Sequence, residues 1–277
     1  MSPSLPPVKY GSKPTDGKNL LVSAAEIEAV LADPIAAKYL RRFIGARELL
    51  HDTPRWCLWL TDAPQVEIDS SEILSNRVSR VRNLRLESSD LATNKAAEWA
   101  HRFQYIRQPS TSYLAIPAHV GENRKYFTAA RYESDVVCGN ANFLIADPDG
   151  FALGVLSSSM FITWMRAIGG RLESRLRFSN TFTYNTFPIP VVTAGQQASI
   201  VEAAKKLADV RATYPGVPLA DLYEGTMASD LVDAHAQIDH AVDRVFNVAV
   251  DAGTEHRTKV LLRHYAKMTG QEGLFEI

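Results

Sequence analysis

The run of residues 170–179 alternates uncharged and charged side chains with a period of two. This period predicts a β-strand with one buried and one exposed face, and no other stretch constrains the fold as strongly. Arg171, Glu173, Arg175 and Arg177 would then project in one row from the exposed face. An Arg guanidinium group can donate two hydrogen bonds to O6 and N7 of guanine, and a carboxylate can accept one from N4 of cytosine. Such a row of side chains could therefore read base edges. The alternative is a solvated strand face on which Glu173 neutralises its neighbours.

The composition is that of a globular protein with one large or two modest domains: 277 residues, 46% hydrophobic and 22% charged. The net charge of −1 does not point to a nucleic-acid partner for the chain as a whole. The charge is unevenly spread, because residues 1–190 contain 22 basic and 19 acidic residues whereas residues 191–277 contain 8 and 12. Four basic residues lie on one helix expected from about residue 69 to 85 and exposed to solvent: Arg77, Arg80, Arg82 and Arg85.

The sequence contains no apolar stretch long enough to cross a bilayer, and its first residues lack the apolar core of a signal peptide. The only cysteines, Cys57 and Cys138, lie in apolar surroundings, which is typical of buried free thiols in a reducing compartment. We therefore expect a cytoplasmic protein with no membrane partner.

The order of elements predicts an α+β fold in three parts. Residues 1–20 are rich in Pro, Gly and Lys and are expected to form a linker or tail. Residues 21–190 combine short β-prone runs with helices and are expected to form a mixed α/β domain with short twisted strands. Residues 191–277 have helical texture, with a capping box at Thr193 and Gln196, and are expected to form an all-helical domain.

Motifs for catalysis are nearly absent. No glycine-rich phosphate loop, nucleophile elbow or His-Glu-x-x-His zinc motif occurs. His235 and Asp239 lie four residues apart on an expected helix, a spacing that could place two metal ligands on one face. A helical His and Asp at this spacing are more often a packing and hydrogen-bonding pair, so no metal is predicted. The sequence therefore favours a chain that is not a complete enzyme.

Several motifs nevertheless occur together in one known family. The stretch of residues 154–190 reads Gly-Val-Leu-Ser-Ser, Trp-Met-Arg-Ala-Ile-Gly-Gly-Arg-Leu-Glu-Ser-Arg-Leu-Arg-Phe-Ser and Tyr-Asn-Thr-Phe-Pro-Ile-Pro in this order. It resembles the target recognition domain of MmeI-like restriction–modification enzymes. Segments upstream and downstream resemble the same family, so that the resemblance covers nearly the whole chain: residues 33–39, 45–48, 55–60, 208–215, 219–223 and 234–239.

The resemblance implies a DNA-specificity module. MmeI-like enzymes combine a nuclease, an adenine-N6 DNA methyltransferase and a specificity domain in one polypeptide, and the region matched here follows the two catalytic parts. The resemblance therefore implies double-stranded DNA and the methyltransferase domain of the parent enzyme, with or without a nuclease, as partners. It implies no catalytic residue and no cofactor in this chain, with S-adenosylmethionine bound by the methyltransferase domain.

The resemblance also assigns base-reading residues. In the family, the strand after the Gly-Arg-Leu motif carries base recognition, which maps here to Glu173 and Arg175 with Arg177 beside them. A second contact region maps to Asn140 and Asn142. An Asn side chain can bind adenine N6 and N7 together, although an ordinary turn would explain the same residues.

Contacts to the DNA backbone are expected from basic residues near these positions: Arg171, Arg166, Arg124, Lys125, Arg77 and Arg80. The assignment of Arg124 and Lys125 is the least direct, because residues 120–126 depart from the family's Ser-Ser-Glu-Arg-Arg-Tyr pattern. Two other functions stay open from the residues alone. The arginines could meet an acidic protein surface, in a protein-interaction module without sequence-specific DNA binding, or His235 and Asp239 could serve a cryptic metal enzyme.

Overall fold

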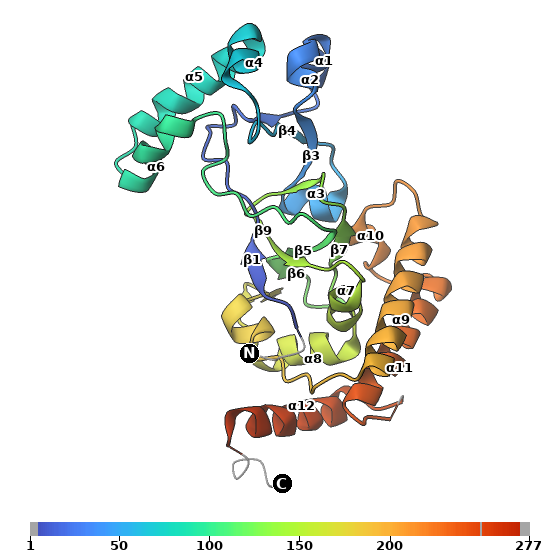
Figure 1. Cartoon of the computed structure of the whole chain (residues 1–277). Helices are drawn as coiled ribbons and strands as arrows, with labels where there is room; N and C mark the ends of the chain where they lie inside the picture. Colours follow the sequence, from blue (N-terminus) through green and yellow to red (C-terminus); the bar gives the residue numbers. More distant parts are fainter. Residues whose placement is uncertain (1–4, 250, 272–277) are drawn as a thin grey trace. The chain divides into compact units, whose positions relative to one another are not determined.

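A computed structural model describes residues 5–249 and 251–271 (Figure 1). The chain forms two compact units and passes between them four times. The first unit contains the described parts of residues 1–9, 111–132 and 143–277, and the second contains residues 10–110 and 133–142. Helices and several small sheets occur together, and the C-terminal region is helical, which confirms the α+β fold class.

The second unit is built on a four-stranded sheet of order β2-β4-β3-β8. Neighbouring strands are antiparallel except for β3 and β8, which run parallel. The backbone passes very close to Phe43 after β8, where a Cβ on Gly139 would lie 2.4 Å from the ring. Glycine is therefore required at this position. The strands are β2 (Leu21–Val22), β3 (Leu40–Ile44), β4 (Trp56–Leu58) and β8 (Val137–Cys138).

Some helices of the second unit begin at a residue whose side chain caps them. Asp33 accepts hydrogen bonds from the amides of Ile35 and Ala36, and Ser71 accepts one from Leu74, because the first amides of a helix lack intrahelical partners. The helices are α1 (Ile27–Ala32), α2 (Pro34–Ala37), α3 (Ala46–His51), α4 (Gln65–Ser70), α5 (Glu72–Leu86), α6 (Leu91–Lys95) and the 3₁₀ turn at Ala96–Trp99.

The expected tail over residues 1–20 is wrong for the part that the structure describes, and residues 1–4 lie outside it. Val8–Tyr10 form strand β1, and Ser12, Asp16 and Leu20 are buried. The Asp16 carboxylate accepts from the amide of Leu20 at 2.6 Å. These residues fold because their backbone polar groups have partners, which composition alone does not reveal.

Arg85 also differs from the expectation of an exposed arginine on helix α5. Its side chain is completely buried, and its five N–H groups all donate to main-chain carbonyl oxygens. The acceptors lie 2.7 to 3.3 Å away on two separate segments: Pro14, Thr15, Ala96, Trp99 and Arg102. Burial lowers the pKa of Arg85, and the nearby carboxylate of Asp16 opposes this. Arg85 therefore fastens the start of the second unit to its last helical turns.

The first unit contains two small sheets. One is four-stranded, with the order β1-β9-β5-β7, and the other is three-stranded, with the order β10-β11-β6. The strand β5 is buried at every residue, as expected of a central strand. Besides β1, the strands are β5 (Tyr113–Pro117), β6 (His119–Val120), β7 (Ala130–Tyr132), β9 (Asn142–Ala146), β10 (Arg171–Leu172) and β11 (Arg175–Arg177).

Helices cover these sheets and complete one core. Thr193 and Gln196 form the expected capping box at the start of α9, and Ser158 caps α8. The helical elements are α7 (Phe151–Leu156), α8 (Ser159–Ile168), a π-helical turn (Asn180–Tyr184), α9 (Ala194–Ala212), α10 (Leu219–Leu222), α11 (Ser229–Val245) and α12 (Thr254–Thr269).

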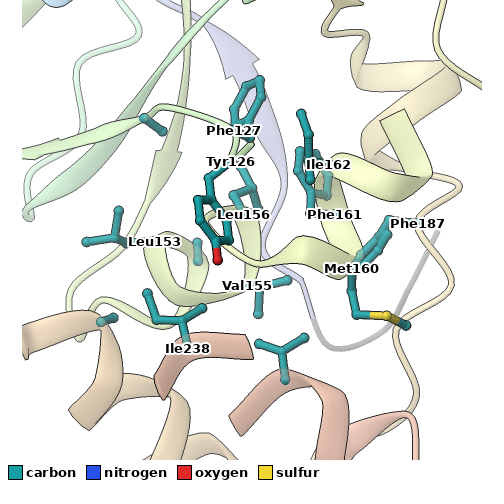
Figure 2. Close-up of a cluster of buried hydrophobic side chains, with 14 of the residues drawn as sticks. Tyr126, Phe127, Leu153, Val155, Leu156, Met160, Phe161, Ile162, Phe187 and Ile238 are labelled. Carbon is teal, nitrogen blue, oxygen red and sulfur yellow. The ribbon is translucent and has the colours of Figure 1, made fainter. Parts of the chain in front are cut away.

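The compact units do not follow the expected division at residue 190. Helices α9 and α11 share a single hydrophobic core with α7, α8 and the sheets, and Figure 2 shows Ile238 of α11 next to the α7 side chains of this core. A Cβ on Gly154 would lie 2.5 Å from Ile200, so α7 and α9 pack closely only because Gly154 has none. The helical C-terminal region, of which residues 250 and 272–277 lie outside the described part, is thus not a separate structural body.

Both cysteines are buried free thiols, and burial raises the pKa of each, to about 12 for Cys138. A search of the described residues finds no helix with both the length and the apolar composition that crossing a bilayer requires.

Candidate nucleic-acid interface

The charged run at residues 170–179 forms a hairpin. Strands β10 and β11 pair antiparallel, and Glu173 and Ser174 make the turn between them. Glu173 has φ of 56°, a left-handed backbone conformation that a two-residue hairpin turn requires. The expectation of one continuous strand is therefore wrong, because the chain reverses direction where the alternation was expected to continue.

The reversal redistributes the four charged residues. Arg175 and Arg177 share one face of β11, as expected. Arg171 lies opposite Leu176 and thus on the other face of the hairpin, since directly opposite residues of an antiparallel pair share a face. Glu173 lies at the tip. The arginine face of the hairpin also includes Leu172, opposite Arg175, and His119 of β6, opposite Arg177.

The hairpin is anchored through its apolar residues. Leu176 and Phe178 are almost completely buried, and the Phe178 ring packs against Phe127 and Phe143 with centroid distances of 5.7 and 5.0 Å. The amide of Phe178 donates to the carbonyl oxygen of Ala118. The arginines between these anchors therefore project from a fixed backbone, which is what a base-reading surface needs.

Arg175 and Glu173 form an exposed ion pair, with 2.8 Å between Arg175 Nη2 and Glu173 Oε2. An ion pair at this exposure is worth about 0–1 kcal/mol, so both side chains can exchange this contact for another at little cost. His119 lies beside the arginines, and partial burial together with the charges of Arg175 and Arg177 lowers its pKa. The hairpin thus offers two guanidinium groups and one carboxylate, and the neighbouring strand β6 adds the imidazole of His119.

The basic side chains of the first unit that were expected to contact phosphates are not all free to do so. Arg171 is half-exposed and lies 3.5 Å from Glu122, and Lys125 is exposed beside the Tyr126 ring. Arg166 and Arg124 are instead engaged with the main chain, since Arg166 Nη2 donates to the Arg124 carbonyl at 2.7 Å.

Arg124 Nη2 in turn donates to the carbonyl of Ala220 at 3.0 Å, and burial lowers the pKa of Arg124. The expected role of Arg124 as a free phosphate contact is therefore not supported by its position.

The second expected base-contact region lies in the second unit. Asn140 is exposed in a turn, as its alternative interpretation expects. Asn142 is completely buried, and its side-chain amide donates to the Ile44 carbonyl at 3.2 Å. The expectation that Asn142 reads a base is corrected by this burial, because strand β9 begins at this residue and turns its side chain inward.

Arg77 and Arg80 lie on helix α5 of the second unit. Arg77 donates to the carbonyls of Asn19 and Leu21 and pairs with Glu26 at 2.7 Å, so its guanidinium group holds the second unit together. This corrects the expectation of Arg77 as a phosphate contact. Arg80 is exposed, as expected.

His235 and Asp239 belong to a buried network. His235 Nδ1 donates to the Ser157 carbonyl, and Nε2 accepts from Tyr223 Oη at 2.7 Å, while Tyr223 accepts from Arg211. Asp239 accepts from the amide and hydroxyl of Ser159. Within residues 5–249 and 251–271, no group of three or more His, Cys, Asp or Glu residues is arranged to hold a metal ion. These contacts give both residues a packing role.

Stability is expected to fall on acidification because of His235. Burial and the charge of Arg211 lower its pKa to about 3, whereas the unfolded chain has the ordinary value near 6.5. The unfolded state therefore binds the additional proton, and this contribution to stability is lost as the pH falls from about 6.5 towards 3. Denaturant unfolding from pH 7 to 4 should show a smaller decline for His235→Gln, by up to about 1.4 kcal/mol per pH unit. Equal slopes would contradict a neutral buried His235.

Two family models match consecutive parts of the chain. The model described as the MmeI target recognition domain matches residues 1–191, and the model described as the MmeI C-terminal domain matches residues 192–272. The chain belongs to the MmeI family. Its hairpin β10–β11 lies within the target recognition domain, and helices α9–α12 make up the C-terminal domain.

A curated relative and a solved structure are also similar to this chain over most of its length. DNA methyltransferase A of Bacillus subtilis (strain 168) is 34% identical over 267 residues, which are 96% of this chain and 30% of the relative. A solved structure of the type IIL restriction–modification enzyme MmeI in complex with DNA is 39% identical, with a TM-score of 0.89. The match covers 96% of this chain and 36% of that one. This chain therefore spans about a third of the length of either relative.

Sequence reasoning missed the positions of His119 in the first unit and of Arg85 in the second. His119 was not singled out, because nothing in its own segment indicates that β6 pairs with β11. The buried role of Arg85 was missed for the same reason, since all its acceptors come from other segments of the chain. Its spacing from Leu74 and Val81, at which residues 74, 81 and 85 share one helix face, was the available signal.

Proposed function

We propose that this chain binds double-stranded DNA and selects the base sequence at which a restriction–modification enzyme acts. The observation that carries the proposal is the core-anchored hairpin β10–β11, which exposes Arg175, Arg177 and Glu173. The major groove admits a two-stranded β-ribbon of this kind. Membership of the target recognition family supports the same function.

In this mechanism the arginines and the carboxylate have separate roles. Arg175 donates two hydrogen bonds to guanine, and Glu173 accepts from cytosine N4 once their exposed ion pair has opened. Arg177 lies further from the tip, on the same face as Arg175. Its role is to support the contact that the neighbouring Arg175 makes with guanine. Arg171 and Lys125 neutralise phosphates and hold the register.

The catalytic steps are assigned to other parts of a parent enzyme. We infer that this chain has no catalytic residue of its own and acts with an adenine-N6 methyltransferase domain, with or without a nuclease. That domain would bind S-adenosylmethionine and flip the target adenine out of the duplex. The family membership supports this division, and it also supports a cytoplasmic location, where such an enzyme meets DNA.

Selection of bound duplexes from a randomised library, repeated over a salt series, tests the proposal. We expect an enriched motif, and an affinity that falls linearly with the logarithm of the salt concentration as phosphate contacts release counterions. Salt-sensitive binding without a motif would contradict base reading by the hairpin. Loss of binding even at low salt would favour a protein-interaction module instead.

The double variant Glu173→Lys with Arg175→Asp is expected to change the preferred base at one position of the motif. The swap keeps opposite charges at the hairpin tip, so folding should be unaffected, while the donor and acceptor exchange places. Each good base contact is worth about 1–3 kcal/mol, which corresponds to a change in preference of roughly 5- to 150-fold.

A matched control is the swap Glu202→Lys with Arg244→Asp, on exposed positions of helices α9 and α11. It changes the same charges outside the hairpin and should leave the motif as it was. An unchanged motif in the Glu173 and Arg175 variant would refute the assignment of the hairpin.

A further inference from the structure

Helix α5 has an exposed face of unusual composition. The helix buries Leu74, Val81 and Arg85 on one side, and the opposite side carries Asn76, Ser79 and Asn83. At 3.6 residues per turn, Arg80 lies about 60° to one side of Asn83 and Arg82 about 100° to the other side. A central stripe of polar uncharged side chains is therefore flanked by an arginine on each side.

The central part of the stripe contains no carboxylate, because residues 73–86 have neither Asp nor Glu. Glu72 and Glu87 lie on the same exposed side, at the two ends of the stripe. Helix α9 shows the ordinary mixture for comparison, with Glu202, Lys205, Lys206 and Asp209 on its exposed side. Asn and Ser are also poorer helix formers than Glu or Lys, so the stripe does not serve the stability of the helix.

The side chains of this stripe are unoccupied. Asn76, Arg80, Arg82 and Asn83 form no hydrogen bond or ion pair with any described residue. Arg77 on the same helix, by contrast, is fully engaged by Glu26 and two carbonyls. The arginines of α5 thus divide into those that hold the fold and those that are available to a ligand.

We propose that α5 is a second DNA-reading element, a recognition helix for the major groove. Asn76 and Asn83 face the base edges, and Arg80 and Arg82 face the phosphates of the two strands. This inference rests on the proposed function but concerns the second unit, whereas the hairpin belongs to the first. Duplex DNA is the partner that fits, because it offers two rows of negative charge with hydrogen-bonding base edges between them.

The spacing along the helix fits base pairs. Asn76 and Asn83 are seven residues apart, which at 1.5 Å per residue is about 10.5 Å, or about three base pairs. An Asn side chain binds adenine N6 and N7 with two hydrogen bonds. Leu86, one turn beyond Asn83 and 51% exposed, offers an apolar contact for a thymine methyl group. The inference therefore specifies two adenines, about three base pairs apart.

Duplex selection with the 277-residue chain and the variant Asn76→Ala with Asn83→Ala tests the inference. Alanine favours helix, so the variant should stay folded. We expect its motif to lose preference at one or two base pairs by roughly 5- to 150-fold each, at positions other than those altered by Glu173→Lys with Arg175→Asp. The matched control is Gln237→Ala, an exposed amide on helix α11, which should leave the motif unchanged.

The phosphate contacts are tested separately. Arg80→Ala and Arg82→Ala should each reduce the slope of log affinity against log salt by about 1, evenly across sequences, whereas Arg244→Ala on α11 should not.

A motif unchanged by the Asn variant would overturn the inference, and if the hairpin variant still altered that motif, the proposed function would stand. No motif with the unsubstituted chain would overturn both. Capture of an acidic protein surface by α5, with DNA binding unaffected by the α5 variants, would also overturn it.

Discussion

Replacement of Arg85 by Met is expected to destabilise the second unit by about 4 kcal/mol. All five carbonyl oxygens would lose their guanidinium donor, and those of Pro14 and Trp99 would keep a main-chain donor, from Gln104 and Arg102. Leaving a buried polar group unsatisfied costs about 1–3 kcal/mol for each group that water cannot reach. The loss should concentrate in residues 10–110, where both ends of this network lie.

Amide hydrogen exchange measures this effect for each unit separately. Amides of α5 and β4 should lose protection, while those of α11 should keep it, because α11 belongs to the other unit. Arg82→Met on the exposed side of the same helix is the control and should change stability by less than about 0.5 kcal/mol. A loss below about 1 kcal/mol for Arg85→Met would mean that water replaces the guanidinium group.

Replacement of Arg257 by Met is expected to destabilise the first unit by about 3–5 kcal/mol, the usual result of removing one partner of a buried ion pair. Arg257 Nη2 lies 2.5 Å from Asp243 Oδ2, and Nε lies 3.1 Å from Oδ1. Asp243 is completely buried, and burial raises its pKa although Arg257 opposes the shift. Without Arg257 the Asp243 carboxylate would be an uncompensated buried charge, and α11 would lose its ion pair with α12.

The pH dependence identifies the cause. In Arg257→Met the pKa of folded Asp243 should rise further above its unfolded value, so the penalty is present at neutral pH and disappears as the pH falls and the carboxyl takes up a proton. Unfolding measurements on the variant and the unsubstituted chain should therefore converge towards acid pH. The double variant Asp243→Asn with Arg257→Met should recover most of the loss at pH 7. A penalty that does not depend on pH would indicate lost packing instead of a buried charge.

Signals that act within one segment predicted the local elements well. Thr193, three residues before Gln196, marked a helix start that the structure confirms, because the capping bond joins residues only three positions apart. The hairpin was not predicted, since alternation looks the same whether the strand continues or reverses at Glu173.

The candidate site was predicted only in part, because the sequence does not show which polar side chains already have partners in the fold. Arg175, Arg177 and Glu173 are exposed, as their charge requires, but Asn142 and Arg77 are occupied by partners from distant segments. An Asn or Arg carries the same hydrogen-bonding groups in either role. Only the position of the carbonyls around it determines whether those groups remain available.

The sequence by itself determined the family, the α+β class, the helix starts and the charged composition of both proposed reading elements, because each depends on residue types in fixed local order. The tertiary structure decided where the hairpin turns, which arginines are free and which are structural, and that the C-terminal helices share a core with the recognition strands. Those outcomes depend on contacts between residues far apart in the chain, such as Arg85 with Pro14 and Gly154 with Ile200. The order of residues in the sequence does not show which distant residues come into contact in the fold.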